Sequence, residues 1–238
     1  MTVKLYWNDA YMKEFDSVVE RIEGSKVMLR ETAFYPTSGG VLNDTGILTA
    51  SGVQYKVVDV SKENDEIFHH LEGTPQLQVG GAVHGVIDWN RRYSLMRHHT
   101  AVHLLDGIVE TKYQTGGITG GQVFPDRARM DFDMGELNRE LVQKILDNAN
   151  AIAQEGHKVS SRIITREEAL AMPNLARTEP GRELIKSMPE VRLVEIEGVD
   201  VQSDGGLHVA NTREIGKMLF SKFENKGKHS KRVEITLS

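Results

Sequence analysis

Two histidines four residues apart, His99 and His103, are well placed to bind a metal ion. If their segment is helical, residues i and i+4 lie one turn apart, so both imidazoles project from the same face. Two neutral imidazoles side by side provide half of a site for a divalent transition metal, usually zinc. The spacing also arises readily by chance, so a metal site requires further ligands from elsewhere in the chain.

A second group of possible ligands lies near the other end of the chain, where Asp204 and His208 flank a glycine pair. A carboxylate oxygen and a third imidazole would complete a set of four with His99 and His103. The glycines would let the backbone turn tightly and approach an ion or a substrate. The same residues also suit an ordinary turn, so the two halves are stronger evidence together than either is alone.

The composition narrows the class of protein. Hydrophobic residues make up 39% of the 238 residues and charged residues 26%, as in an ordinary globular protein. The N-terminus lacks the apolar stretch of a signal peptide, and no apolar run approaches the roughly 18 residues that would span a membrane. The absence of cysteine excludes disulfides and sulfur-ligated zinc and fits a cytoplasmic protein. A net charge of −5 means that RNA binding would depend on a local basic patch.

Short strand-like segments separated by turn sequences occupy the first part of the chain, which favours a small barrel or sandwich. The expected strands are 3–7, 15–23, 26–31, 44–49, 53–61, 66–71 and 82–87. At Asp88 the pattern changes, because this residue can cap a helix that begins at Trp89 and runs to about Lys112. We therefore expect two domains, residues 1–88 and 89–238.

The second part interleaves strands with helices, which predicts an α+β domain of two layers. The expected strands are 118–124, 127–132, 159–164, 191–196, 214–223 and 232–237. A helix over 137–154 has its apolar residues on one stripe and ends at Gly156, and a short helix begins with Thr165 and Glu168 as a capping box. Residues 172–189 are expected to be irregular or briefly helical.

Four blocks of sequence resemble one family, the free-standing alanyl-tRNA editing proteins, which are similar to the editing domain of alanyl-tRNA synthetase. These blocks are the glycine-rich segment 34–46, the first histidine motif 96–105, the second motif 204–216 and the segment 224–233. The resemblance implies a β-barrel followed by an α+β domain of the threonyl and alanyl synthetase additional-domain type. This sequence departs from the family pattern at three positions. Asp204 stands where cysteine is usual, Leu207 where threonine is usual, and Val41 where glutamine is usual. These departures are compatible with an altered substrate preference or with weakened activity.

The resemblance implies an activity: hydrolysis of the ester that joins serine or glycine to the terminal ribose of alanine tRNA. Zinc would be held by His99, His103 and His208, with Asp204 or water as the fourth ligand. His98 is a candidate general base, but it points about 100° away from His99 on a helix, which favours a supporting or surface position, so we assign no general base. The candidates for recognising the substrate are Thr100, Thr115, Thr119 and Gln122. The last three could equally belong to a plain loop, and Thr100 could bond its own helix.

Basic residues near both histidine motifs are candidates for contact with mischarged alanine tRNA, whereas we expect neither a membrane nor DNA as a partner. They are Arg91, Arg92, Arg97, Lys217, Lys222, Lys226, Lys228, Lys231 and Arg232. Such side chains bind phosphates without reading sequence, although a solvated basic face is a common alternative. Two other functions remain open: a non-catalytic tRNA-binding or partner-binding module with the same fold, and a metallohydrolase for a small ester or amide.

Overall fold

The computed structural model describes residues 2–113, 117–172, 175, 179–227 and 230–238. The chain divides into two compact units, Met1–Leu95 and Met96–Ser238, and the division falls inside helix α1 (Trp89–Ile108). The domain boundary expected between residues 88 and 89 stays a prediction. In the described part of the chain, no helix is both long and apolar enough to cross a membrane.

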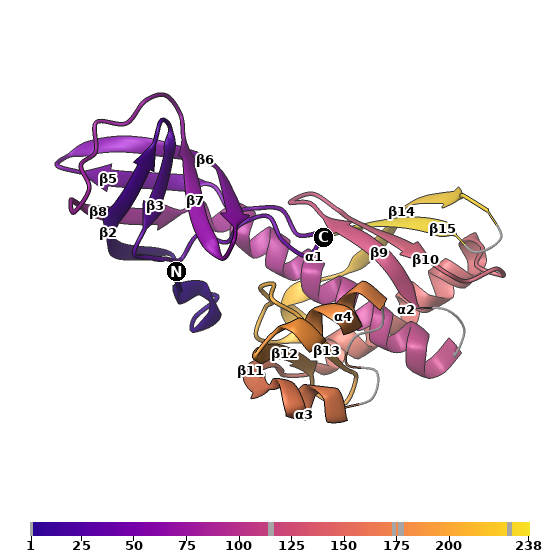
Figure 1. Cartoon of the computed structure of the whole chain (residues 1–238). Coiled ribbons are helices and arrows are strands. Elements are labelled where there is room, and N and C mark those ends of the chain that lie inside the picture. The colour runs from indigo at the N-terminus through magenta and orange to yellow at the C-terminus, as the bar shows by residue number, and fades with distance from the viewer. Residues whose placement is uncertain (1, 114–116, 173–174, 176–178, 228–229) are drawn as a thin grey trace. The chain divides into compact units, whose positions relative to one another are not determined.

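The first unit contains a closed antiparallel barrel in the order β2-β3-β7-β6-β5-β8 (Figure 1). Its strands are β2 (Glu14–Glu23), β3 (Lys26–Leu29), β5 (Gly46–Ala50), β6 (Val53–Glu63), β7 (Glu66–Leu71) and β8 (Ala82–Ile87). Alternate residues of a strand face opposite sides of a sheet, and in β8 every second residue is buried. The barrel expected from the turn spacing is confirmed.

The expected strand over residues 3–7 is wrong beyond its first residues. Strand β1 (Val3–Lys4) gives way to a 3₁₀ helix (Leu5–Trp7), and β1 pairs in parallel with β4 (Glu31–Thr32). The 3₁₀ turn buries Tyr6, whose ring meets Tyr35 edge-on with centroids 5.5 Å apart. Aromatic packing therefore determines the conformation of this segment, although its alternating apolar residues would also suit a strand.

A buried ion pair between Arg92 and Asp44 organises the first unit. Both side chains are 1% exposed, and the Arg92 guanidinium also donates to the carbonyls of Ala10 and Ala33. Asp44 in turn accepts the Tyr35 N–H at 2.6 Å. Arg92 is therefore unavailable for the expected contact with RNA, because its guanidinium N–H groups donate to acceptors inside the protein.

The expected cap of α1 is present, since the Asp88 carboxylate accepts the Arg91 N–H at 3.2 Å.

The second unit combines two antiparallel sheets with helices, as expected for an α+β domain. One sheet has the order β14-β15-β10-β9 and the other the order β11-β12-β13. The strands are β9 (Ile118–Val123), β10 (Ala128–Phe132), β11 (Val159–Thr165), β12 (Glu190–Ile196), β13 (Asp200–Ser203), β14 (Met218–Asn225) and β15 (Lys231–Leu237). The helices are α2 (Arg139–Glu155), α3 (Arg166–Ala171) and α4 (Glu179–Ser187), and a π-helical turn (Val109–Tyr113) extends α1.

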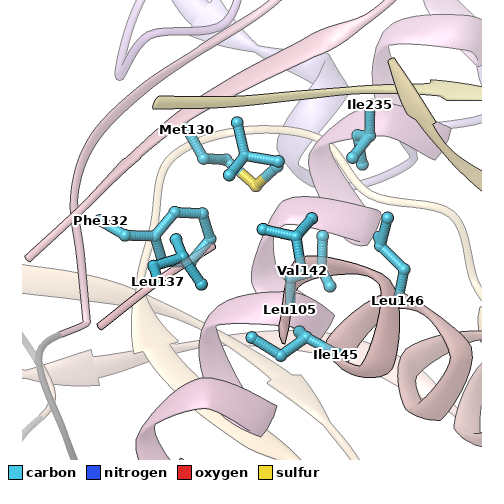
Figure 2. Close-up of a pocket in the computed structure, with 9 residues that line it drawn as sticks. Leu105, Met130, Phe132, Leu137, Val142, Ile145, Leu146 and Ile235 are labelled. Atoms are coloured by element: carbon cyan, nitrogen blue, oxygen red, sulfur yellow. The ribbon is translucent and has the colours of Figure 1, made fainter. Parts of the chain in front are cut away.

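Helix α2 follows the sequence prediction closely. The Asn138 side chain caps it by accepting the Leu141 N–H, and Gly156 ends it in the left-handed conformation at φ 85°. Its apolar face meets α1, β10 and β15 around a cavity of about 10 Å³ (Figure 2). The lining residues are Leu105, Met130, Phe132, Leu137, Val142, Ile145, Leu146, Val233 and Ile235. Because these side chains are all apolar, they offer a water molecule no hydrogen bonds.

The expected strand over residues 214–223 is wrong at its start. Residues Thr212–Ile215 form a 3₁₀ helix, and β14 begins only at Met218. The Asn211 side chain accepts a backbone N–H of this turn while Glu214 accepts the Asn211 N–H, so a capping box overrides the strand pattern. The capping box expected at Thr165 and Glu168 is confirmed at the start of α3.

We predict that the buried barrel residue His69 stays neutral until the pH is strongly acidic. Its Nδ1 donates to the Val27 carbonyl, its Nε2 accepts from Thr32, and burial lowers its pKa to about 4 from the usual 6.5. The unfolded chain therefore binds more protons between pH 6.5 and 4, so the free energy of unfolding falls as the pH falls through this window. The contribution of this one group is roughly 3 kcal/mol.

An NMR titration of the imidazole Cε1 proton tests this prediction, with the His69 signal assigned by its loss in His69→Gln. A midpoint near 6.5 would contradict it.

Candidate metal centre

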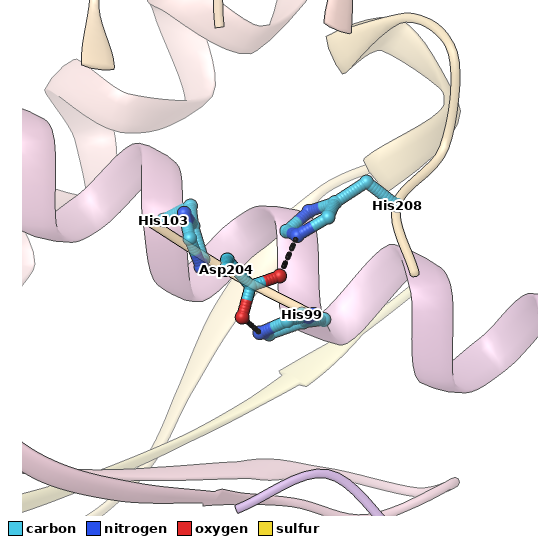
Figure 3. A group of neighbouring side chains, drawn as sticks. All are labelled: His99, His103, Asp204 and His208. Carbon is cyan, nitrogen blue, oxygen red and sulfur yellow. Dashed lines mark hydrogen bonds and ion pairs between the residues drawn. The ribbon is translucent and has the colours of Figure 1, made fainter. Parts of the chain in front are cut away.

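Four side chains from two distant segments meet inside the second unit. His99 and His103 come from α1, and Asp204 and His208 come from the loop after β13 (Figure 3). Their possible ligand atoms all lie within 4.8 Å of one another. The His208 ring stacks on the His99 ring with centroids 4.2 Å apart. The structure therefore brings together the two groups of candidate ligands that the sequence suggested.

The hydrogen-bond partners of two Nδ1 atoms set the tautomers of His99 and His208. His99 Nδ1 lies 3.3 Å from the Leu207 carbonyl, which can only accept. His208 Nδ1 lies 3.1 Å from the Thr100 hydroxyl, which gives its own hydrogen to the Met96 carbonyl and therefore also accepts. In the neutral form both rings carry the proton on Nδ1, so both Nε2 lone pairs are directed into the cluster.

The third histidine, His103, lies next to the Asp200 carboxylate. His103 Nδ1 lies 3.4 Å from Asp200 Oδ2, a charge contact slightly longer than an ordinary hydrogen bond. A carboxylate also only accepts, so it favours a proton on Nδ1 and leaves Nε2 as a ligand. Burial opposes a charge on His103, but Asp200 and the nearby Asp204 outweigh it and raise its pKa.

The other three side chains have protonation states that suit a cation: two neutral imidazoles and one ionised carboxylate. Burial lowers the pKa of His99 to about 4, against the opposing effect of Asp204, and burial together with His99 lowers the pKa of His208 well below its usual value. Burial alone would raise the pKa of Asp204, but the surrounding imidazoles outweigh it and keep that pKa well below the usual value. The neutral His208 Nε2 and the Asp204 Oδ2 are then two acceptors 3.0 Å apart. Only a proton or a cation between them stabilises this arrangement, so the residues fit a divalent metal.

Arg192 on β12 fixes the turn that carries Asp204. Its Nη1 donates to the carbonyls of Asp204 and Gly206 at 3.0 and 2.8 Å, and the Gly206 N–H donates to Asp204 Oδ2 at 2.8 Å. A Cβ at residue 206 would lie 2.4 Å from the His99 ring, so only glycine fits. Sequence reasoning missed Arg192, although a charged residue within the apolar run 191–194 was the available signal.

The candidates for recognising the substrate have different environments. Thr100 is fully buried and positions His208. Thr119 is exposed on β9 and donates to the Asp131 carbonyl at 3.2 Å, while Gln122 accepts from Arg129 at 3.1 Å. His98 is 3% exposed. Thr115 lies outside the described residues.

The expected basic surface is largely occupied by internal partners. Lys231 is 6% exposed and donates to Asn225 and Gly227, which corrects its expected contact with RNA. Arg232 forms a two-pronged ion pair with Asp131 at 2.7 Å, and Arg97 donates to backbone carbonyls of its own unit. Lys222 and Lys226 both pair with Glu224, and Lys228 lies outside the described residues.

The register of the four-stranded sheet explains this neutralisation. One row across the strands contains Gln122, Arg129, Glu234 and Lys222, and the next contains Gly120, Asp131, Arg232 and Glu224. Positive and negative side chains alternate along both rows, so each charge faces an opposite one. Such a face stabilises the sheet through cross-strand pairs rather than concentrating positive charge.

Comparison with known protein families follows the same division of the chain. Residues 6–91 match the family described as tRNA synthetases class II (A), and residues 191–234 match the threonyl and alanyl tRNA synthetase second additional domain. The barrel, the α+β unit and these matches place the chain in the class of proteins built from tRNA synthetase domains.

Individual relatives identify the family. The chain is 42% identical to the alanyl-tRNA editing protein AlaX-M of Saccharolobus solfataricus, over 100% of this chain and 99% of the relative. It is 41% identical to the AlaX-M protein of Methanosarcina mazei, over 100% of this chain and 97% of the relative. It also matches the alanine–tRNA ligase of Ignicoccus hospitalis at 40% identity, over 91% of this chain but 24% of the ligase. The chain belongs to the family of alanyl-tRNA editing proteins, as the sequence motifs predicted.

We predict that His103→Ala and His208→Ala lose bound zinc, whereas Asp204→Ala retains zinc at reduced affinity. Three imidazoles remain in the aspartate variant, and water can take the fourth position. Zinc content after gel filtration and competition with a chromophoric chelator measure the difference, and the NMR signal of His69 reports whether the barrel is still folded. Unchanged zinc in both histidine variants would disprove the site, and a completely empty Asp204→Ala would show that the carboxylate is indispensable.

We predict that Thr100→Val weakens zinc binding by about tenfold or more, because partners behind a metal-binding histidine typically contribute this much. Valine nearly preserves the buried shape but cannot accept the His208 Nδ1–H. Thr100→Ser keeps the hydroxyl and should retain the wild-type affinity in the same chelator competition. Equal affinity of all three proteins would show that the hydroxyl does not orient His208.

Proposed function

We propose that this protein hydrolyses, in trans, the ester that joins serine or glycine to alanine tRNA, with zinc held by His99, His103, His208 and Asp204. One observation carries the proposal: three imidazole nitrogens and one carboxylate converge in a buried cluster whose outer partners favour free Nε2 lone pairs. Membership of the alanyl-tRNA editing family supports the choice of substrate.

A bound zinc ion would supply Lewis-acid chemistry for polarising a carbonyl or activating water. The contribution of the chain is to hold the ligands rigidly and to position the ester beside them. An aminoacyl ester is already reactive, so positioning and modest electrostatic help suffice. Arg192 and Gly206 keep Asp204 next to His99, which fixes one side of the place where the ester would lie.

Discrimination between serine and alanine requires a group that recognises the serine hydroxyl. A site built for that hydroxyl leaves its own polar group without a partner when alanine binds, which disfavours alanine. We propose Thr119 for this role, because its hydrogen is directed to the Asp131 carbonyl and its side chain is accessible in the free protein, where bound substrate would cover it. Its oxygen is therefore free to accept a hydrogen bond from the substrate.

The proposed partner is mischarged alanine tRNA. Lys217, Lys222 and Lys226 are exposed, and we propose them for phosphate contact. At Lys222 and Lys226, the phosphate would displace the Glu224 carboxylate from its ion pair with the lysine. These contacts would position the tRNA backbone without reading its sequence.

We predict metal-dependent loss of serine from serine-charged alanine tRNA, with alanine-charged tRNA left intact. The assay compares the wild type as purified, after removal of metal and after restoring zinc, with His208→Ala as the inactive control. Bound zinc and retained tRNA without turnover would instead indicate a binding module. Equally fast hydrolysis of a free aminoacyl ester would indicate a metallohydrolase for small esters.

A further inference from the structure

A layer of polar side chains lies behind His103, on the side away from the other ligands. Asp200 and Gln202 come from β13 and Asp106 from α1, and both carboxylates belong to residues that are 5% exposed. The Gln202 Nε2 donates to Asp200 Oδ2 and to Asp106 Oδ2, each at 2.9 Å. Because the amide nitrogen carries two hydrogens, each carboxylate can receive one.

The same layer reaches the backbone of β9. Asp106 Oδ1, the oxygen that Gln202 does not contact, accepts the N–H of Ile118 at 3.1 Å. Ile118 is the first residue of β9 and precedes Thr119. A continuous chain of contacts therefore runs from His103 through Asp200, Gln202 and Asp106 to the start of β9.

A glycine lets the strand approach the helix closely enough for these contacts. A Cβ at Gly107 would lie 2.8 Å from the Asp200 Cβ and 2.9 Å from the Val199 carbonyl. Gly107 follows Asp106 directly on α1, so the same turn of helix supplies the carboxylate and the space. The distance between β13 and α1 is thus fixed by backbone packing, which holds the Gln202 amide between its two acceptors.

We propose that Gln202 is a positioning residue that couples the orientation of His103 to the position of the β9 start. Its amide is suited to this role because it is neutral and donates to both carboxylates. A glutamate at the same place would bring a third carboxylate against the first two. The inference rests on the proposed function only for its effect on substrate, since zinc affinity and backbone protection are independent of the reaction.

The test replaces Gln202 with methionine, which preserves the length of the side chain but has no N–H. We expect zinc affinity, measured by chelator competition, to fall about tenfold or more, as for other partners behind a metal ligand. We also expect faster hydrogen exchange at the Ile118 amide, because Asp106 loses one of the donors that orient it. The matched control is Gln143→Met, since Gln143 donates to Asp147 at 2.9 Å on the exposed surface of α2.

A second pair of variants keeps the test decisive if Gln202→Met does not fold. Asp200→Asn keeps an oxygen that can accept from Gln202 and His103, whereas Asp200→Ala removes it, so only the alanine variant should lose zinc affinity. Wild-type zinc affinity together with unchanged Ile118 exchange in Gln202→Met would overturn the inference. If the wild type itself does not deacylate tRNA, the proposed function fails, while zinc affinity and exchange still decide this inference.

Discussion

Metal binding in the second unit would depend on where three histidine protons lie. A metal-binding imidazole must present a lone pair, and each ring has two nitrogens that could do so. Leu207, Thr100 and Asp200 place acceptors behind His99, His208 and His103 and so favour the same choice in all three. The i, i+4 spacing puts His99 and His103 on one face of α1, and the acceptors beside their Nδ1 atoms leave both Nε2 atoms available for a metal.

The departures from the family pattern have a structural explanation. Leu207 is buried and serves the site through its carbonyl, so a hydroxyl side chain is not needed for that contact. Val41 is buried and its backbone pairs with Ser38, which suits an apolar side chain. Asp204 has one oxygen engaged by the Gly206 N–H and the other 3.9 Å from His99 Nε2. The Asp204 carboxylate is therefore part of this turn and is held in place as a candidate ligand by the Gly206 N–H.

The sequence predicted what depends on local pattern. Period-two alternation and turn spacing indicated the barrel, and the apolar stripe with Gly156 indicated α2. Residue chemistry alone selected the four candidate ligands. The supports escaped prediction because they depend on long-range pairing: Gln202 meets Asp106 across 96 residues and Arg232 meets Asp131 across 101. A count of basic residues likewise could not show that Arg92 is buried, since burial is a property of the fold.

Metal binding would be linked to the stability of the second unit, because the candidate ligands come from two separate segments. Helix α1 and the loop after β13 supply two candidate ligands each, and unfolding would separate them. An ion that binds only the folded state stabilises it by about 2.7 kcal/mol when its free concentration is a hundred times the Kd. Without an ion, the His208 Nε2 and Asp204 Oδ2 acceptors lie 3.0 Å apart, and this contact costs free energy unless the two atoms share a proton. The arrangement of acceptors that favours a cation is therefore unfavourable for the cluster when no cation is bound.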